Sequence, residues 1–372
     1  MKKTMRLSDI VLMNLTAIVG FRWIPVAAAY GASAVVLWFL AALLFFIPLG
    51  LVAAELATAW PDQGGLYQWV RRAHGEKPAF LTSWFYWITN LFYYPSLLTF
   101  IAVTIAFVID PALADNKLYV CAVVIGLFWA VTILNLRSMT VGKWLSNLGG
   151  TLGTLVPGLI IVVLAPLSVW LWKRPVQTDF SLSAMIPHLS GSNNIAFLST
   201  LMFAMAGMEL TPILAGETED PGRTFPRATV ISAVLIAFIY IIGTMAMNMV
   251  LAPEAVGAAS GIMDASAIIA RETGFRTIVP LMAWLMVIGG LGGISVWTVG
   301  PIKMLFESTK QGVLPEFFTK LNRYGMPGNA MISQAFLITL IVLFTSLLPT
   351  VNTFYSVLVM MTTITYFLPY LL

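Results

Sequence analysis

The chain has 372 residues, of which 59% are hydrophobic and only 10% are charged, and its formal net charge is +4. A soluble domain carries about 25% charged residues, so this composition excludes an ordinary soluble enzyme and also a disordered chain. Apolar stretches of about 20 residues, the length that crosses a bilayer as a helix, recur along the chain. They are continuous and not alternating, which excludes a membrane β-barrel. The predicted fold class is an all-α integral membrane protein.

Ten membrane-spanning helices are predicted, and they form a single transmembrane domain over residues 1–372. In chain order we expect them at residues 10–31, 34–58, 80–109, 118–136, 146–172, 194–214, 227–252, 277–307, 329–349 and 352–372. The first five belong to one repeat at about 8–172, and the last five to a second repeat at about 194–372. Because the chain ends on an apolar stretch without a basic flank, we expect it to be truncated.

Basic residues lie mostly in every second connection between the predicted spans. The positive-inside rule then places the N-terminus in the cytoplasm. We expect a multi-pass protein of the inner or plasma membrane. Because the basic residues are scattered and not clustered on one face, a nucleic-acid partner is not expected. The expected surroundings are a lipid bilayer, and the sequence leaves an accessory subunit or a homodimer open.

Two of the predicted spans contain a break at the same internal spacing. In the first span, Gly20 and Pro25 weaken helical hydrogen bonding in mid-membrane, and Arg22 lies between them. The sixth span repeats the pattern over residues 207–212, with Glu209 two positions after the glycine. Five helices separate the two breaks, so the broken helices run in opposite directions. Paired interruptions in two inverted halves indicate a transporter binding site.

The breaks also suggest what binds there. Unwinding frees backbone groups, and half-helix N-termini suit a carboxylate while half-helix C-termini suit an ammonium group. A zwitterionic amino acid supplies both charges at short range. We therefore expect an amino acid substrate, with its carboxylate near the backbone of Ile18, Val19, Gly20 and Phe21 and its ammonium near the carbonyls of Phe203, Ala204 and Ala206.

Three segments resemble a known family. They read WFLAALLFFIPLGLVAAELATAWPDQGGLYQWV, AGMELTPILAGETEDPGRTFPRA and VWTVGPIKMLFESTKQGVLPEFFTKLNRYGMPGNAMISQ. The chain resembles the glutamate/γ-aminobutyrate antiporters of the amino acid–polyamine–organocation (APC) superfamily, most specifically in its Gly-x-Glu, E-x-x-x-P-G-R-x-x-P and G-x-L-P motifs. The resemblance implies a LeuT-type inverted repeat of five plus five helices, with helices 1 and 6 discontinuous. Relatives usually carry two further helices, so ten here implies truncation from twelve.

The resemblance also implies roles for single residues. The family's glutamate in the sixth span falls on Glu209, just after the break at Gly207. The aromatic gate six residues earlier falls on Phe203, and the tryptophan that covers the substrate falls on Trp297. The first span departs from the family, because bulky residues and Arg22 replace a small Gly-Ser-Gly-like stretch.

The roles of the two charged residues stay open at this point. A charge at the bilayer centre costs at least about 2.5–3.5 kcal/mol, so Arg22 should face a cavity or a partner. It either binds a substrate carboxylate with its guanidinium fork or forms a structural ion pair with Glu209. Glu209 in turn either binds the substrate ammonium, carries a coupled proton, or braces the unwound segment. A buried cation at Arg22 favours acidic or neutral substrates over cationic ones.

The expected function is secondary active transport of an amino acid, most specifically exchange by alternating access with Trp297 as a lid. The protein is not expected to be an enzyme, and no cofactor or metal is expected, because no motif for either is present. The first alternative is a proton-coupled symporter. Proton-coupled relatives can carry a lysine deep in the fifth span, and its absence here favours exchange. A substrate-sensing transporter homologue and a channel are further alternatives.

Overall fold

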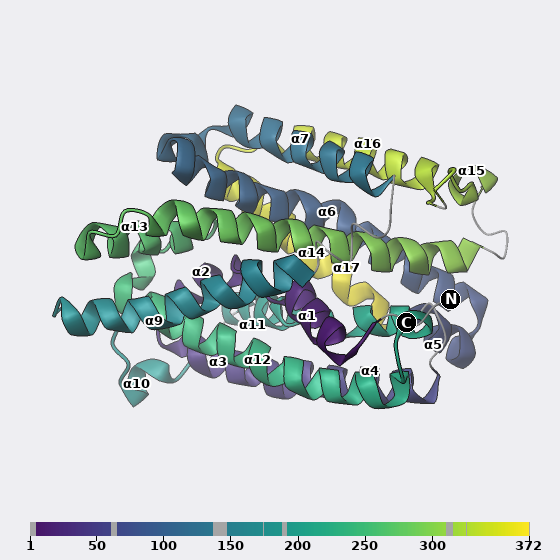
Figure 1. Ribbon diagram of the computed structural model, residues 1–372, viewed down its shortest axis with the longest axis horizontal. Helices are drawn as coiled ribbons and strands as arrows, with labels where there is room; N and C mark the ends of the chain where they lie inside the picture. Colours follow the sequence, from purple (N-terminus) through teal and green to yellow (C-terminus); the bar gives the residue numbers. More distant parts are fainter. Residues whose placement is uncertain are drawn as a thin grey trace.

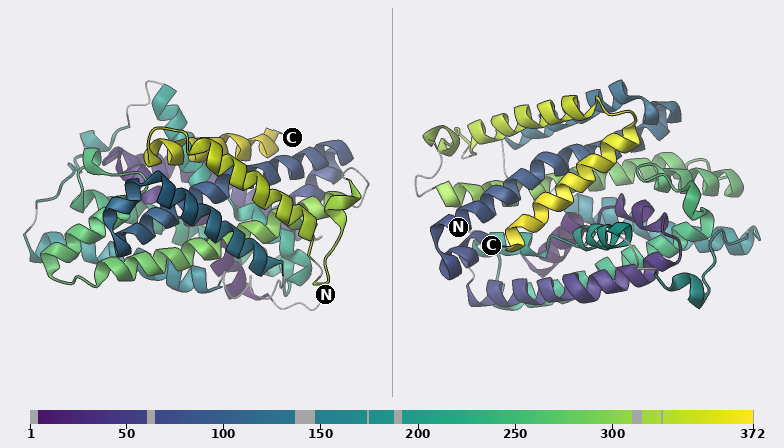
Figure 2. Two further views of the ribbon diagram at one scale, coloured as in Figure 1. Left: turned by 90° about the horizontal axis from the view of Figure 1, so that it is seen from above. Right: turned by 180° about the vertical axis from the view of Figure 1, so that it is seen from behind.

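A computed structural model of the chain describes residues 5–60, 65–136, 147–173, 175–187, 192–309, 315–324 and 326–371. In this part of the chain the regular secondary structure is helical, apart from one isolated bridge between Met5 and Thr218. The helices run along a common long axis, and both chain ends lie toward the same end of the bundle (Figures 1 and 2). Gly312, Val313 and Leu314 of the predicted G-x-L-P motif lie outside the described residues.

The long helices agree closely with the predicted spans. Over the described ranges, nine helical segments are long and apolar enough to cross a membrane. The uninterrupted ones are α6 (Glu76–Ile109), α7 (Lys117–Asn135), α12 (Pro221–Val250), α14 (Ile278–Thr309), α16 (Gly328–Thr345) and α17 (Val351–Phe367), which continues into the 3₁₀ helix η6 (Leu368–Leu371). Two others contain a π-helical turn: α3 (Ser33–Ala41), η1 (Ala42–Phe46) and α4 (Ile47–Ala59) form the second span, and η3 (Thr151–Leu155) and α9 (Val156–Leu171) belong to the fifth.

Two helices begin earlier than predicted. Helix α6 begins at Glu76 and not at residue 80, and α12 begins at Pro221 and not at residue 227. Both extra turns are polar, so an apolar count misses them, although proline at the first helical position is a recognised start signal.

The short connecting helices were not predicted, because none is long or apolar enough to register as a span. They are α5 (Leu66–His74), η2 (Pro111–Asp115), α10 (Leu182–Met185), η5 (Pro253–Ala255), α13 (Gly261–Thr273) and α15 (Glu316–Thr319).

The first and sixth spans are both discontinuous, as predicted. Helix α1 (Leu7–Ile18) ends at Ile18, residues 19–22 are not helical, and α2 (Trp23–Ala28) follows. Helix α11 (Ser192–Ala204) is separated by residues 205–207 from the 3₁₀ helix η4 (Met208–Glu217). Gly207 has φ +124°, a backbone conformation that a residue with a Cβ atom rarely adopts.

The broken helices lie inside the bundle. Helices α7 and α16 lie along one side and α3, α4 and α12 along the other, with α1, α2 and α11 between them (Figure 1). Helix α6 packs against both α14 and α17, and α1 packs against α12. The breaks are therefore surrounded by continuous helices that position them.

Glycines bring the fifth and eighth spans into direct backbone contact. A Cβ atom on Gly153 in η3 would lie 2.1 Å from the backbone nitrogen of Gly289 in α14. One turn away, a Cβ atom on Gly149 would lie 2.9 Å from the Cα atom of Gly292. Small residues allow such close approach of membrane helices. Here no side chain fits between the two backbones.

The start of the chain is tied to the segment that follows the sixth span. The backbone nitrogen of Met5 donates to the carbonyl oxygen of Glu217 (3.1 Å), and the nitrogen of Glu219 donates to the carbonyl oxygen of Met5 (2.9 Å). These two bonds join the segment that precedes α1 to the end of η4 and the residues that follow it. The two broken spans are thus linked at the end of the bundle that carries the N-terminus.

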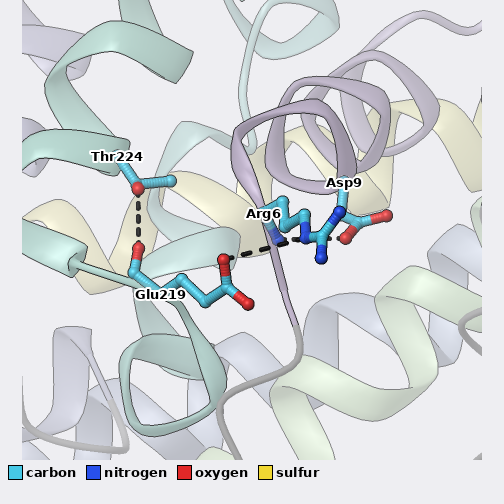
Figure 3. Close-up of polar contacts among 4 residues, drawn as sticks. All are labelled: Arg6, Asp9, Glu219 and Thr224. Carbon is cyan, nitrogen blue, oxygen red and sulfur yellow. Dashed lines mark hydrogen bonds and ion pairs between the residues drawn. The ribbon is translucent and has the colours of Figure 1, made fainter.

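Side chains add to this link (Figure 3). Arg6 Nε lies 3.8 Å from Glu219 Oε2, and the backbone nitrogen of Arg6 donates to Asp9 Oδ2 (3.0 Å). The carbonyl oxygen of Glu219 accepts a hydrogen bond from Thr224 Oγ1 at 2.7 Å. The Arg6 and Glu219 side chains are 77% and 50% exposed, so their ion pair is worth at most about 1 kcal/mol. The backbone bonds are the main tie.

Candidate functional site

A small buried cavity lies between the two breaks. All nine residues that the sequence proposed for substrate contact line it, namely Ile18, Val19, Gly20, Phe21, Arg22, Phe203, Ala204, Ala206 and Trp297. Residues of α6, η3 and α14 complete the wall, whereas Gly207 and Glu209 do not line it. The cavity volume is about 30 Å³, room for one or two water molecules. An amino acid therefore fits only if the wall rearranges.

Arg22 lies in the wall of this cavity and is held there without a carboxylate. Its Nη1 atom donates to Ser96 Oγ (2.5 Å), and Ser96 Oγ donates in turn to the carbonyl oxygen of Tyr93 (2.9 Å). The guanidinium carbon lies 4.3 Å from the ring centroid of Trp23 and 4.9 Å from that of Tyr93. Only 1% of the residue is exposed, and its Nη2 atom has no hydrogen-bond partner. The guanidinium thus has a donor to spare.

Glu209 does not pair with Arg22, so the ion-pair alternative is wrong. Its Oε1 atom accepts hydrogen bonds from the hydroxyl of Tyr86 at 2.6 Å and from that of Tyr366. The hydroxyls of Tyr366 and Tyr370 lie 2.7 Å apart. We call Tyr86, Tyr366 and Tyr370 the tyrosine cage. Within the described ranges no ion pair between Arg22 and Glu209 is formed.

The tyrosine cage joins three spans that are far apart in the sequence. Tyr86 belongs to α6, Tyr366 to α17 and Glu209 to η4. Glu209 is 1% exposed, and its Oε2 atom has no hydrogen-bond partner. The sequence predicted the glutamate but not the tyrosines, because nothing in their spacing shows that α17 returns to the sixth span.

Trp297 lies between the cavity and the tyrosine cage. Its Nε1 atom donates to the carbonyl oxygen of Ala17 (2.8 Å), in the last turn of α1. Its ring lies 4.9 Å from that of Tyr93, on the cavity side, and 5.9 Å and 6.2 Å from the rings of Tyr86 and Tyr366. This geometry is compatible with the predicted lid, and the substrate contact itself stays a prediction.

Tyr240 joins the two breaks and was missed by the sequence. Its hydroxyl accepts a hydrogen bond from the nitrogen of Gly20 (3.1 Å) and lies within donating distance of the carbonyl oxygens of Ile18 (2.6 Å) and Ala204 (2.9 Å). Its ring stacks on that of Trp38 at 4.5 Å and 4°. A tyrosine in mid-membrane needs a partner for its hydroxyl, which is the signal that would have identified it.

The hydroxyl of Tyr240 cannot satisfy both carbonyl groups at once. A phenol has one hydrogen to donate, so either the oxygen of Ile18 or that of Ala204 is left without it. Both residues line the cavity. One carbonyl oxygen at the breaks is therefore left without the hydrogen of Tyr240, and Arg22 Nη2 in the cavity wall is left without an acceptor.

In the described residues no group of three or more His, Cys, Asp or Glu side chains is placed to bind a metal ion. The chemistry of the cavity is that of one cation, backbone carbonyls and aromatic rings. Such a set binds and orients a small polar molecule, and it offers no activated nucleophile.

Comparisons with known proteins point the same way. A family model described as amino acid permease matches residues 6–372. An uncharacterized transporter of Legionella pneumophila is 37% identical over 358 residues, which are 96% of this chain and 76% of that protein. A glutamate/gamma-aminobutyrate antiporter of Lactococcus lactis is 25% identical over 306 residues, which are 81% of this chain and 60% of the antiporter.

The fold also has a solved counterpart. A structure of a Na⁺-coupled sialic acid symporter in a substrate-bound, outward-open state matches 99% of this chain and 79% of its own, with a TM-score of 0.59 and 12% identity. The two proteins share a LeuT-like fold. At this identity the likeness concerns the fold alone.

Proposed function

Because this chain belongs to the amino acid permease family, and is therefore a multi-pass membrane transporter and not an enzyme, we propose that it is an amino acid exchanger that works by alternating access. The observation that carries the proposal is the cavity lined by both discontinuous helices. In this proposal the chain consists of a first repeat at about 8–172 and an inverted second repeat at about 194–372, and its N-terminus lies in the cytoplasm. Broken helices at a repeat interface are where such transporters bind substrate.

The substrate lies between the breaks with its two charges apart. Its carboxylate contacts the free Nη2 atom of Arg22, and its ammonium contacts the carbonyl oxygen of Ile18 or Ala204 that Tyr240 leaves without a hydrogen. Charge-assisted hydrogen bonds of this kind are worth about 1.5–3 kcal/mol each. Three residues after Ala204, Gly207 has φ +124°, which turns the chain out of the helical path at the second break.

Entry requires the wall to open, since about 30 Å³ does not hold an amino acid. We place the moving element at Trp297, because its indole lines the cavity and lies between it and the tyrosine cage, with one hydrogen bond to the carbonyl oxygen of Ala17. Beyond it, opening of the tyrosine cage around Glu209 gives the other side of the membrane access to the site. Phe203 lies against both regions, 5.4 Å from the ring of Trp23 and 5.1 Å from that of Tyr366.

The buried charge of Arg22 in the cavity wall favours exchange over net uptake. No group among the described residues accepts a hydrogen bond from Arg22 Nη2. Reorienting an unpaired charge through a low-dielectric region is unfavourable, and a bound carboxylate removes that penalty. A loaded carrier should therefore change sides more readily than an empty one, which is the condition for exchange.

The test uses the purified protein in proteoliposomes. Vesicles loaded with a mixture of unlabelled amino acids and matched empty vesicles are offered a panel of labelled amino acids and amines. Uptake only into loaded vesicles supports exchange and identifies the substrate. No flux in either set, from protein that still binds an amino acid, contradicts transport and supports a substrate sensor.

A matched pair of tryptophan variants assigns the flux to the cavity. Trp297 is 2% exposed beside the cavity, whereas Trp284 on the same helix is 58% exposed. We expect Trp297→Phe to reduce exchange by at least about tenfold through loss of the indole hydrogen bond and ring area. Trp284→Phe should leave exchange unchanged, and equal losses would remove the cavity from the mechanism.

Proton-coupled symport is the second candidate, and Glu209 favours it. Glu209 is a buried acidic residue in a membrane span with one unpartnered oxygen, and intramembrane acidic residues mark ion and proton pathways in transporters. Accumulation in empty vesicles under an imposed pH gradient, lost in Glu209→Gln, would establish symport. Uptake that ignores the pH gradient supports the exchanger.

A further inference from the structure

A second cavity lies away from the two breaks, between α6, α14, α15 and α16. Its volume is about 390 Å³, within the range of about 300–1,000 Å³ that is common for ligand sites. Trp84 and Trp87 of α6 line it together with Phe318 of α15 and Leu337 of α16. Leu337 is 40% exposed, so the cavity lies at the outer face of the bundle. It shares no lining residue with the cavity between the breaks.

The wall of this second cavity is apolar. Among its described lining residues, Ser333 carries the only hydroxyl, and none is charged. The indole nitrogen of Trp87 is already used, because it donates to Gln334 Oε1 at 2.8 Å. A buried water molecule needs about two to four polar partners, and a zwitterionic amino acid would lose its hydration here without replacement. The wall therefore suits an apolar occupant.

A basic segment borders the cavity at the end of the bundle where both chain ends lie (Figure 1). Phe318 and Pro327 line the cavity, and the residues between them include Lys320 and Arg323, which are both exposed. One acidic residue, Glu316, precedes them in α15, so the segment keeps a net positive charge. Positive charge and apolar volume are thus next to each other.

Hydrogen bonds hold this segment against its neighbours. Asn329 Nδ2, in the first turn of α16, donates to the carbonyl oxygen of Phe317 (2.9 Å). Asn322 Nδ2 donates to the carbonyl oxygen of Leu136 (2.8 Å), which follows α7, and the nitrogen of Asn322 donates to the carbonyl oxygen of Met326 (2.7 Å). The two basic residues therefore lie on a backbone that is fixed in advance, which lowers the entropy cost of binding an anion.

We propose that this cavity binds an acyl chain of an anionic phospholipid, whose phosphate contacts Lys320 and Arg323. Acyl chains are the apolar molecules that surround a membrane-spanning helix, and the outer face of α16 is apolar, with Phe336 60% and Phe344 76% exposed. An empty apolar cavity forfeits packing contacts along its lining, and an acyl chain restores them. Basic residues close to a membrane surface attract anionic headgroups.

The test measures lipid binding to the purified protein in detergent, by native mass spectrometry and by thermal unfolding. The probes are dioleoyl phosphatidylglycerol, dioleoyl phosphatidylcholine with the same acyl chains, and glycerol phosphate without a chain. We expect phosphatidylglycerol to bind at least about tenfold more tightly than phosphatidylcholine, since each basic residue near the surface contributes about fivefold. Glycerol phosphate should not raise the unfolding temperature. Equal binding of the two lipids, or equal stabilisation by glycerol phosphate, overturns the proposal.

Variants that fill the cavity test the acyl-chain contact. Ala330→Phe and the smaller change Ser333→Leu place a side chain in the cavity, and each should lower the affinity for phosphatidylglycerol by at least about tenfold. Without lipid they should unfold at the wild-type temperature or above it, because the new side chain replaces empty volume. Ile332→Phe, on the same helix but outside the wall, should keep the wild-type affinity. Unchanged affinity in both filling variants contradicts the proposal.

A pair of double variants tests the headgroup contact. Lys320→Gln with Arg323→Gln should lower the affinity for phosphatidylglycerol to that for phosphatidylcholine. Arg271→Gln with Arg276→Gln removes the same charge from exposed positions in and after α13, at the opposite end of the bundle (Figure 1), and should keep the wild-type preference. A preference that survives the first double substitution rules out the assigned phosphate contact.

The oligomeric state of the same variants separates a lipid from a second copy of this protein. If Ala330→Phe converts a dimer into a monomer, measured by light scattering, and leaves lipid binding unchanged, the cavity belongs to an interface between copies and the proposal is overturned. Lipid binding is measured without flux. Its failure therefore leaves the proposed exchange standing, and failure of exchange leaves the lipid site standing.

Discussion

The two breaks share a sequence pattern and differ in what they do with their charge. In both, a glycine is followed two positions later by a charged residue and five positions later by a proline. Yet Arg22 faces the cavity, whereas Glu209 lies outside it in the tyrosine cage. Arg22 belongs to the unwound residues 19–22, while Glu209 is already inside the first turn of η4. Equal spacing therefore does not place two side chains equivalently, because the second break resumes its helix sooner.

The two breaks are complementary in the hydrogen-bonding group that each leaves without a partner. The first break has a donor without an acceptor at Arg22 Nη2, and the second has an acceptor without a donor at Glu209 Oε2. They do not satisfy each other, since the indole of Trp297 lies between their surroundings. One deficit faces the cavity and is open to a ligand. The other lies beside the tyrosine cage and outside the cavity wall.

The largest effect is expected from the glycine of the second break. Gly207→Ala should lower stability by about 1–3 kcal/mol, because φ of +124° strains any residue with a Cβ atom. The added atom would also lie 3.1 Å from Ile18 Cγ1. Gly20→Ala meets no such strain and only side-chain atoms of Trp23 at 3.1 Å, so it should be tolerated better. Thermal unfolding in detergent measures both, and equal losses would contradict the comparison.

Removing the hydroxyl that joins the breaks comes next. Tyr240→Phe should lower stability by about 1–3 kcal/mol, because it leaves the nitrogen of Gly20 without its acceptor. It should also weaken substrate affinity, since the carbonyls of Ile18 and Ala204 lose their fixed positions. Tyr324→Phe, at a 47% exposed position, is the control and should change neither. Retention of wild-type affinity in Tyr240→Phe would show that the breaks are held by packing alone.

Glu209→Gln tests the charge at the second break, because it removes that charge and keeps the shape of the side chain. The amide oxygen still accepts from Tyr86 and Tyr366, so stability should change by less than about 1 kcal/mol. Since Glu209 lies outside the cavity wall, the affinity for the exchanged amino acid should stay within about twofold of the wild type. A loss of affinity as large as that caused by Arg22→Gln, measured by the same binding assay, would mean that the two charges act on one site.

The smallest effect is expected at the link between the two broken spans. Arg6→Ala removes an exposed ion pair with Glu219 and should cost at most about 1 kcal/mol, and less at high salt. The backbone bonds between Met5 and residues 217–219 remain. A larger loss, measured by thermal unfolding at low and high salt, would show that the side chains and not the backbone carry the link.

Much of this architecture could be predicted from the sequence. Continuous apolar length predicts the spans to within a few residues, because each helix must be long enough to cross the hydrocarbon core of the bilayer. The breaks were predictable from Gly20, Pro25 and the corresponding residues of the sixth span, since glycine and proline act locally on the backbone. Eight of the nine cavity residues lie in or beside the breaks, because an unwound segment presents its own backbone and neighbours to the space it opens, whereas Trp297 was placed by the family resemblance.

The partners of those residues were not predictable in the same way. Ser96, Tyr240 and the tyrosine cage reach the site from α6, α12 and α17, which are remote in sequence. Which tyrosine of an apolar helix points inward depends on how the helix is rotated, and a helix that is apolar all round carries little information on that. The ion-pair hypothesis failed for this reason, because it assumed that two charges in two breaks must face each other.

The contact between Gly153 and Gly289 has a consequence for motion. Interlocked side chains resist sliding, since each must leave its rotamer well before a neighbour passes. Where two backbones touch with no Cβ atom between them, there is nothing to unlock. The π-helical turn at Thr151–Leu155 adds a second hydrogen-bonding register on the same segment. Small displacements along this crossing therefore meet no side chain, whereas a shift by a whole residue would bring a side chain between backbones that leave no room for one.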